Sequence, residues 1–156
     1  MKKVLLLKFG ELFLKGKNRH EFIKLLKNNI SKKLKNIDCK LEETQGRLVV
    51  HSYSAMYEDE IVEKLQQVFG LIAVMKADEI DSSLQEIESY VEKLDFSGVS
   101  TFRIETKRAD KTFPMTSMEL DKHLGGVVLD KNPNLKVDLY TPEKIVNVEY
   151  LKEYFS

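Results

Sequence analysis

The chain has 156 residues, in which 25 Lys and Arg balance 25 Asp and Glu, with a hydrophobic fraction of 42% and one cysteine. This length suits one ordinary domain or two small ones, and the composition predicts a globular cytoplasmic protein. No apolar run approaches the roughly 20 residues of a membrane-spanning helix, so a membrane partner is not expected. The lone Cys39 excludes an intrachain disulfide and a cysteine-cluster metal site.

The neutral total hides an uneven distribution of charge. Residues 1–40 contain 12 Lys and Arg against 3 Asp and Glu, a balance of +9. Residues 77–156 contain 10 Lys and Arg against 16 Asp and Glu, a balance of −6. Such polarity can orient a polyanion on one end of the molecule. The alternative that Lys32, Lys33 and Lys35 form only a solvated helix face stays open.

The first half, residues 1–76, is predicted to be a βαββαβ unit. Val4–Phe9 is almost wholly apolar, which indicates a buried central strand. Apolar residues at a spacing of three to four predict one helix through residues 22–34 and a second through residues 61–69. A hairpin between the helices and a closing strand at Leu71–Ala77 complete the ferredoxin-like, split βαβ pattern.

The second half, residues 77–156, is predicted to follow the order α-β-α-β-β. Leu84–Leu94 has the periodicity of a short amphipathic helix, and Thr101–Lys107 alternates as a strand does. Thr116 with Glu119 forms a candidate capping box at the start of a further helix. Alternation predicts two last strands at Leu135–Leu139 and Ile145–Tyr150. The expected fold class is therefore α+β, a ferredoxin-like unit followed by a mixed α/β domain.

A first cationic cluster lies in the loop that joins the first strand to the first helix. This loop contains two glycines and carries Lys15, Lys17 and Arg19. Backbone N–H groups and the helix dipole favour an anion at a helix N-terminus, and Lys and Arg add full charges there. The loop is a candidate phosphate-binding site.

A second cationic cluster follows the predicted strand at Thr101–Lys107. It consists of Lys107, Arg108 and Lys111, with Phe113 and Thr116 as weaker candidates. A basic loop with an aromatic residue suits a nucleic-acid end, where phosphates are neutralised and an exposed base can stack. The alternative is an ordinary charged strand exit with Phe113 packed in the core.

Catalytic motifs are scarce in this sequence. It contains no G-x-x-x-x-G-K-[ST] phosphate loop, no G-x-G-x-x-G fingerprint and no G-x-S-x-G nucleophile elbow. The three histidines, at positions 20, 51 and 123, lack metal-ligand spacing. We therefore expect no catalytic residue, metal site or cofactor in this chain.

The first cluster and its surroundings resemble a known family. The family is that of the tRNA 4-thiouridine synthetases, which are sulfurtransferases also tied to thiamine synthesis. This chain resembles their N-terminal ferredoxin-like domain in the motif Gly10-Glu11-Leu12-x-Leu14-Lys15-Gly16-Lys17-Asn18-Arg19, followed by Gly46-Arg47-Leu48. The second half resembles the THUMP domain that follows in that family. The matching residues are Phe102-x-Ile104-x-Thr106-Lys107-Arg108-Ala109-Asp110-Lys111-x-Phe113-x-x-Thr116-Ser117 and Lys136-Val137-Asp138-Leu139-x-x-Pro142. The boundaries implied are 1–76 and 77–156.

The resemblance implies a tRNA-binding module that grips the acceptor end of tRNA and presents a uridine for 4-thiolation. In that family a separate ATP-pyrophosphatase domain with an S-G-G-x-D-S loop performs the chemistry, and no such loop occurs in these 156 residues. The chain is therefore expected to be an excised fragment or a naturally truncated homologue. ATP and a sulfur-donor protein are expected only for the full-length context.

Two readings compete with tRNA binding. A ferredoxin-like regulatory or assembly module that binds a small anion needs only the Gly10–Arg19 loop and leaves the second cluster unexplained. A stand-alone enzyme is disfavoured by the missing nucleophile, metal set and nucleotide loop. The sequence leaves a homodimer, the preferred tRNAs and the packing of the two halves open.

Overall fold

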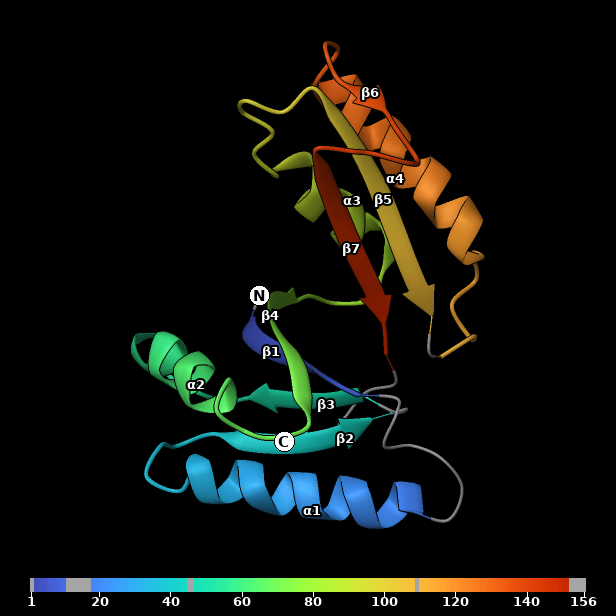
Figure 1. The fold of residues 1–156 in the computed structure, drawn as a ribbon. Helices are drawn as coiled ribbons and strands as arrows, with labels where there is room; N and C mark the ends of the chain where they lie inside the picture. The colour runs from blue at the N-terminus through green and yellow to red at the C-terminus, as the bar shows by residue number, and fades with distance from the viewer. Residues whose placement is uncertain (1, 11–17, 45–46, 109, 152–156) are drawn as a thin grey trace. The chain divides into compact units, whose positions relative to one another are not determined.

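The computed structural model describes residues 2–10, 18–44, 47–108 and 110–151. The chain divides into two compact units, with the division between Glu79 and Ile80 (Figure 1). The first unit contains, in chain order, β1 (Lys2–Phe9), α1 (Asn18–Lys33), β2 (Lys40–Thr44), β3 (Arg47–His51), the 3-10 helix η2 (Ala55–Tyr57), α2 (Glu58–Leu65) and β4 (Leu71–Glu79). The second contains α3 (Leu84–Glu92), β5 (Thr101–Arg108), α4 (Ser117–Lys131), β6 (Lys136–Val137) and β7 (Lys144–Tyr150). Within the described residues, no helix is long and apolar enough to cross a membrane.

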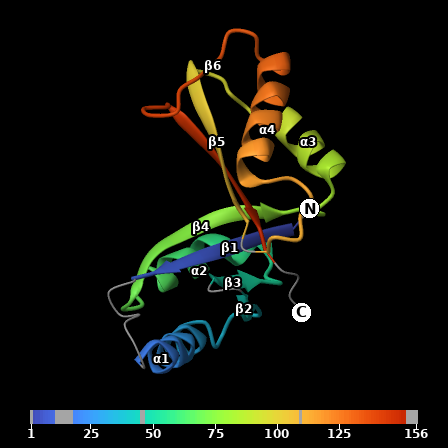
Figure 2. The ribbon, with the colours of Figure 1, turned by 90° about the vertical axis from the view of Figure 1, so that its right-hand side faces the viewer.

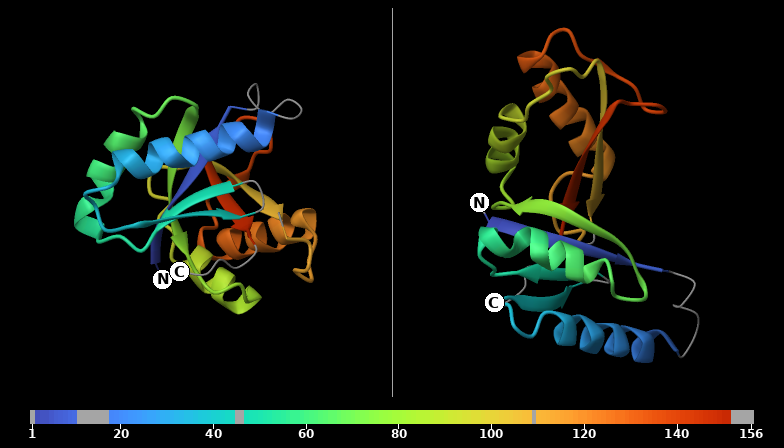
Figure 3. Two further views of the ribbon diagram at one scale, coloured as in Figure 1. Left: turned by 90° about the horizontal axis from the view of Figure 1, so that it is seen from below. Right: turned by 60° about the vertical axis from the view of Figure 1, so that its left-hand side comes forward.

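The first unit is built on a four-stranded antiparallel sheet in the order β2-β3-β1-β4. β1 is the apolar strand that the sequence predicts, and it lies between β3 and β4, where both of its edges are hydrogen-bonded. Both helices cover the same face, because α1 and α2 contribute their buried side chains to one cluster with those of β1 and β3 (Figure 3). This order and layering are those of the ferredoxin-like fold, as predicted.

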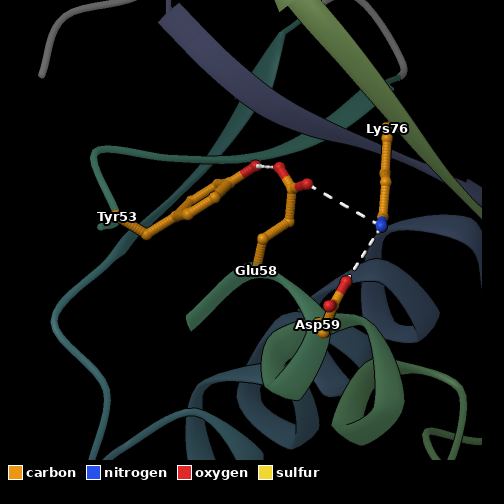
Figure 4. A network of polar contacts seen from close by, with 4 residues as sticks. All are labelled: Tyr53, Glu58, Asp59 and Lys76. Carbon is orange, nitrogen blue, oxygen red and sulfur yellow. Dashed lines mark hydrogen bonds and ion pairs between the residues drawn. The ribbon is translucent and has the colours of Figure 1, made fainter. Parts of the chain in front are cut away.

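A polar network fixes β4 to the start of α2 (Figure 4). The Tyr53 hydroxyl donates to Glu58 Oε2 at 2.7 Å, and Lys76 Nζ on β4 donates to Asp59 Oδ1 at 2.9 Å. Lys76 Nζ also lies 3.8 Å from the other oxygen of Glu58. Burial and the neighbouring Glu58 carboxylate raise the pKa of Tyr53, so its hydroxyl keeps the proton that it donates.

The second unit has a three-stranded parallel sheet in the order β6-β5-β7. α3 and α4 lie side by side (Figure 2), and their apolar stripes pack with Phe102 and Ile104 of β5 in a second core. β5 alternates, so Phe102, Ile104 and Thr106 are buried while the residues between them are more exposed. His123 of α4 pairs with Glu88 of α3, which assigns this histidine to helix packing.

One predicted strand is shorter than expected. The alternation over Leu135–Leu139 predicts a five-residue strand, but β6 comprises only Lys136 and Val137. The cause is Asp138, whose Oδ1 accepts hydrogen bonds from the backbone N–H groups of Tyr140 and Thr141, both at 3.0 Å. A side chain that bonds its own backbone locally competes with the strand ladder and turns the chain. These bonds also hold the pKa of Asp138 below its usual range.

Candidate nucleic-acid interface

The second cationic cluster lies at one end of the second unit. β5 and β7 are parallel, so their carboxyl ends meet at one edge of the sheet, where Arg108 is in register with Tyr150. The loop after β5 leads to the amino end of α4 at the same end of the unit (Figures 1 and 2). The cations therefore lie close to a helix N-terminus, where backbone N–H groups favour anions.

Lys107 and Lys111 are the accessible cations of this cluster. Lys107 is exposed on the sheet face opposite the helices, and Lys111 is exposed in the loop before α4. Glu149 of β7 is in register with Lys107, so the two side chains point to the same face of the sheet. The two lysines can contact a polyanion without any rearrangement of the core.

Arg108 is placed differently from its neighbours. It is half-buried on the helix side of β5, and its Nη1 donates to the carbonyl oxygen of Phe113 at 3.3 Å. This bond closes the loop between β5 and α4 on itself. Asp110 supports the same loop, since its N–H donates to the Tyr150 carbonyl and its Oδ1 accepts from Thr112 N at 3.0 Å. Arg108 therefore shapes the loop that carries Lys111.

Phe113 is a core residue in this structure. Only 6% of it is exposed, and its ring centroid lies 5.0 Å from that of Tyr150. These surroundings fit the alternative stated for the sequence, in which Phe113 is packed in the core. Stacking of a base on Phe113 stays a prediction, and its burial does not favour that stacking. Sequence reasoning missed Tyr150 and Glu149, because only the long-range pairing of β5 with β7 brings them to this loop.

Thr116 forms the N-cap of α4. Its Oγ1 accepts from Glu119 N at 3.1 Å, and Glu119 Oε1 accepts from Thr116 N at 3.4 Å, which confirms the predicted capping box. The Thr116 hydroxyl accepts in this arrangement, so its own proton can still be donated to a phosphate oxygen. Thr116 is exposed, like Lys107 and Lys111.

The first cluster is described only in part. Arg19 is exposed in the first turn of α1, next to the exposed His20. Lys15 and Lys17 lie outside the described residues, so their contribution to a phosphate site stays a prediction. Among the residues that the structure describes, no group of three or more His, Cys, Asp or Glu could hold a metal ion.

Comparisons with known proteins match both units. The model of the ThiI ferredoxin-like domain family matches residues 4–74, and the THUMP domain model matches residues 77–156. A probable tRNA sulfurtransferase of Caldanaerobacter subterraneus subsp. tengcongensis is 40% identical over 99% of the chain and 41% of its own length. The chain thus spans about two fifths of this curated relative.

Two solved structures are similar over 96% of the chain, both at 27% identity. PH1313 from Pyrococcus horikoshii has a TM-score of 0.81, with 51% of that chain covered, and a 4-thiouridine synthetase in complex with RNA and ATP has a TM-score of 0.74, with 38% covered. The fold and these matches define a THUMP-domain protein. The chain belongs to the THUMP family, in the form in which a ThiI ferredoxin-like domain precedes the THUMP domain.

Proposed function

We propose that this chain is a tRNA-binding module that grips the acceptor end of tRNA through phosphate contacts. It presents the tRNA for uridine 4-thiolation by a separate catalytic domain, and a sulfur-donor protein would act only with that domain. The observation that carries the proposal is the pair of exposed lysines in the THUMP unit, Lys107 near the carboxyl end of β5 and Lys111 in the loop that leads to the capped amino end of α4. The relatives named as tRNA sulfurtransferases and the synthetase solved with RNA support tRNA as the ligand.

The proposed contacts divide into direct and supporting roles. Lys107, Lys111 and Arg19 neutralise phosphates, together with Lys15 and Lys17, and the Thr116 hydroxyl adds a hydrogen bond. Arg108 and Phe113 hold the loop after β5 in shape through the Arg108–Phe113 carbonyl bond and the Phe113–Tyr150 ring contact. Binding of this kind depends on electrostatics and RNA shape, so the affinity should fall steeply with added salt.

The test compares a double variant with a charge-matched control. Lys107→Ala with Lys111→Ala should weaken binding of an intact tRNA about tenfold or more and reduce the slope of log K against log salt by about 2, one for each lost phosphate contact. The control, Lys131→Ala with Lys136→Ala, removes two exposed lysines, one in the last turn of α4 and one in β6 next to the start of β5, and should change neither. Filter binding or fluorescence anisotropy over a salt series measures both quantities.

A second RNA separates an acceptor-end grip from a generic polyanion surface. The same tRNA without its single-stranded 3′ end should bind more weakly than the intact molecule, because an end-binding module loses its contacts there. Equal affinity for both RNAs would contradict the acceptor-end proposal. Competition by phosphate metabolites in preference to tRNA would favour the small-anion module instead.

A further inference from the structure

A second surface of the first unit combines charge with exposed apolar groups. A groove of about 330 Å³ lies between the last turns of α1 and the turn that follows α2. It is lined by Asn29, Lys32, Lys33, Gln67, Val68 and Phe69. None of these residues belongs to the cationic clusters assigned to RNA.

The wall formed by Phe69 has a fixed backbone. Val68 N donates to the Leu65 carbonyl at 3.0 Å. Gly70, two residues further on, adopts a φ of 100°, a conformation that L residues with a side chain rarely adopt. A Cβ at position 70 would lie 3.0 Å from Phe22 Cζ, so the turn also packs tightly on α1. Phe69, the residue before Gly70, is 78% exposed to solvent.

The groove is cationic. Lys33 Nζ donates to the neutral Gln67 Oε1 at 2.9 Å, and within the described part of the chain neither Lys32 nor Lys33 forms an ion pair with a carboxylate. Lysines in the last turn of a helix also complement its dipole. The dipole accounts for lysines at this end of α1 but not for the exposed Phe69 beside them. Outside the lining, Leu25 is 58% exposed one helical turn before Asn29.

We propose that this groove docks an acidic segment of a partner protein. An apolar side chain of the segment would pack on Phe69, which is 78% exposed, and flanking carboxylates would pair with Lys32 and Lys33. Charge complementarity selects an acidic partner, because the lining residues include two cations and no Asp or Glu. Single-stranded RNA fits the lining less well, since a strand normally binds a longer run of cations than the two that the lining offers.

The experiment uses a defined probe, a capped peptide of the sequence Glu-Glu-Leu-Glu-Phe-Glu. Amide chemical-shift changes on titration of the ¹⁵N-labelled full chain should centre on Asn29, Lys33 and Phe69. Phe69→Ala and Lys33→Glu should each raise the peptide Kd about tenfold or more, as expected for an aromatic anchor and its charged partner. Lys24→Glu is the matched control, because it makes the same charge change at an exposed position of the same helix outside the groove.

The outcomes separate this site from tRNA binding. Amide chemical-shift changes centred outside the groove, or no changes at millimolar peptide, would overturn the docking site. An equal loss of peptide affinity in Lys33→Glu and Lys24→Glu would overturn it as well. Preferential binding of an unpaired RNA oligonucleotide at Phe69 would overturn it in favour of an RNA contact. Phe69→Ala should leave tRNA affinity unchanged. The docking site is therefore tested by Phe69→Ala and Lys33→Glu, and tRNA binding by the separate double variant at Lys107 and Lys111.

Discussion

Lys107 and Arg108 are consecutive residues of one basic run, and the pleat of β5 gives them different roles. Lys107 is exposed on the face away from the helices, while Arg108 is half-buried and donates to the Phe113 carbonyl. A count of charges in the sequence assigns both to the polyanion equally. Their alternation in the strand shows that Arg108→Ala would alter the loop as well as the charge, which is why the RNA test replaces Lys107 and Lys111 instead.

Tyr53 offers a test of a single polar contact. Tyr53→Phe removes the donor to Glu58, which is 8% exposed, and leaves a buried carboxylate oxygen without that hydrogen bond. An unsatisfied buried acceptor costs about 1–3 kcal/mol, so the free energy of unfolding of the variant should be lower by about that amount. In urea denaturation this appears as a lower midpoint. Tyr57→Phe, an exposed position in the adjacent 3-10 helix, is the control and should match the wild type. Equal midpoints for all three proteins would contradict a structural role for the network.

At the scale of elements, two glycines differ in their tolerance of a side chain. Gly70, in the connection between α2 and β4, has a positive φ and a close neighbour, whereas Gly126 lies in helix α4 with open space around it. Gly70→Ala puts a Cβ at φ of 100° and 3.0 Å from Phe22, and it should destabilise the first unit by about 1–2 kcal/mol. Gly126→Ala lies within α4 with open space around the new Cβ and should stabilise the second unit by about 1 kcal/mol. Thermal unfolding followed by circular dichroism measures both. A change of the same sign in the two variants would contradict these assignments.

Sequence patterns predicted the elements better than the positions of side chains. The βαββαβ order and the capping box at Thr116 are confirmed because they depend on local periodicity and local hydrogen bonds. The short β6 was not predicted, since alternation cannot reveal that the Asp138 carboxylate would bond the backbone after it. The surroundings of Phe113 and the groove at Phe69 depend on pairing between distant segments, which no local pattern encodes.

At the scale of the whole molecule, the two units should be separable. Every residue of the first buried cluster lies between Leu5 and Val74, and all four strands of its sheet end by Glu79. A fragment of residues 1–79 should therefore fold and give dispersed amide signals in a ¹H–¹⁵N spectrum. A fragment of residues 1–70 lacks β4, leaves one edge of β1 unpaired and should aggregate or stay unfolded. Failure of the longer fragment to fold would show that the first unit depends on the second.

The central position of β1 has a consequence for synthesis on the ribosome. Among the strands of this sheet, β1 is translated before its partners β3 and β4, which follow only at residues 47–51 and 71–79. The apolar stretch at Val4–Leu7 must therefore wait, without its two hydrogen-bonding neighbours, while most of the first unit is translated. Exposed apolar segments and unpaired strand edges are in general the features that make an incompletely folded chain prone to aggregation. The order of strands in the sheet thus leaves β1 without both of its partners until β4 has left the exit tunnel.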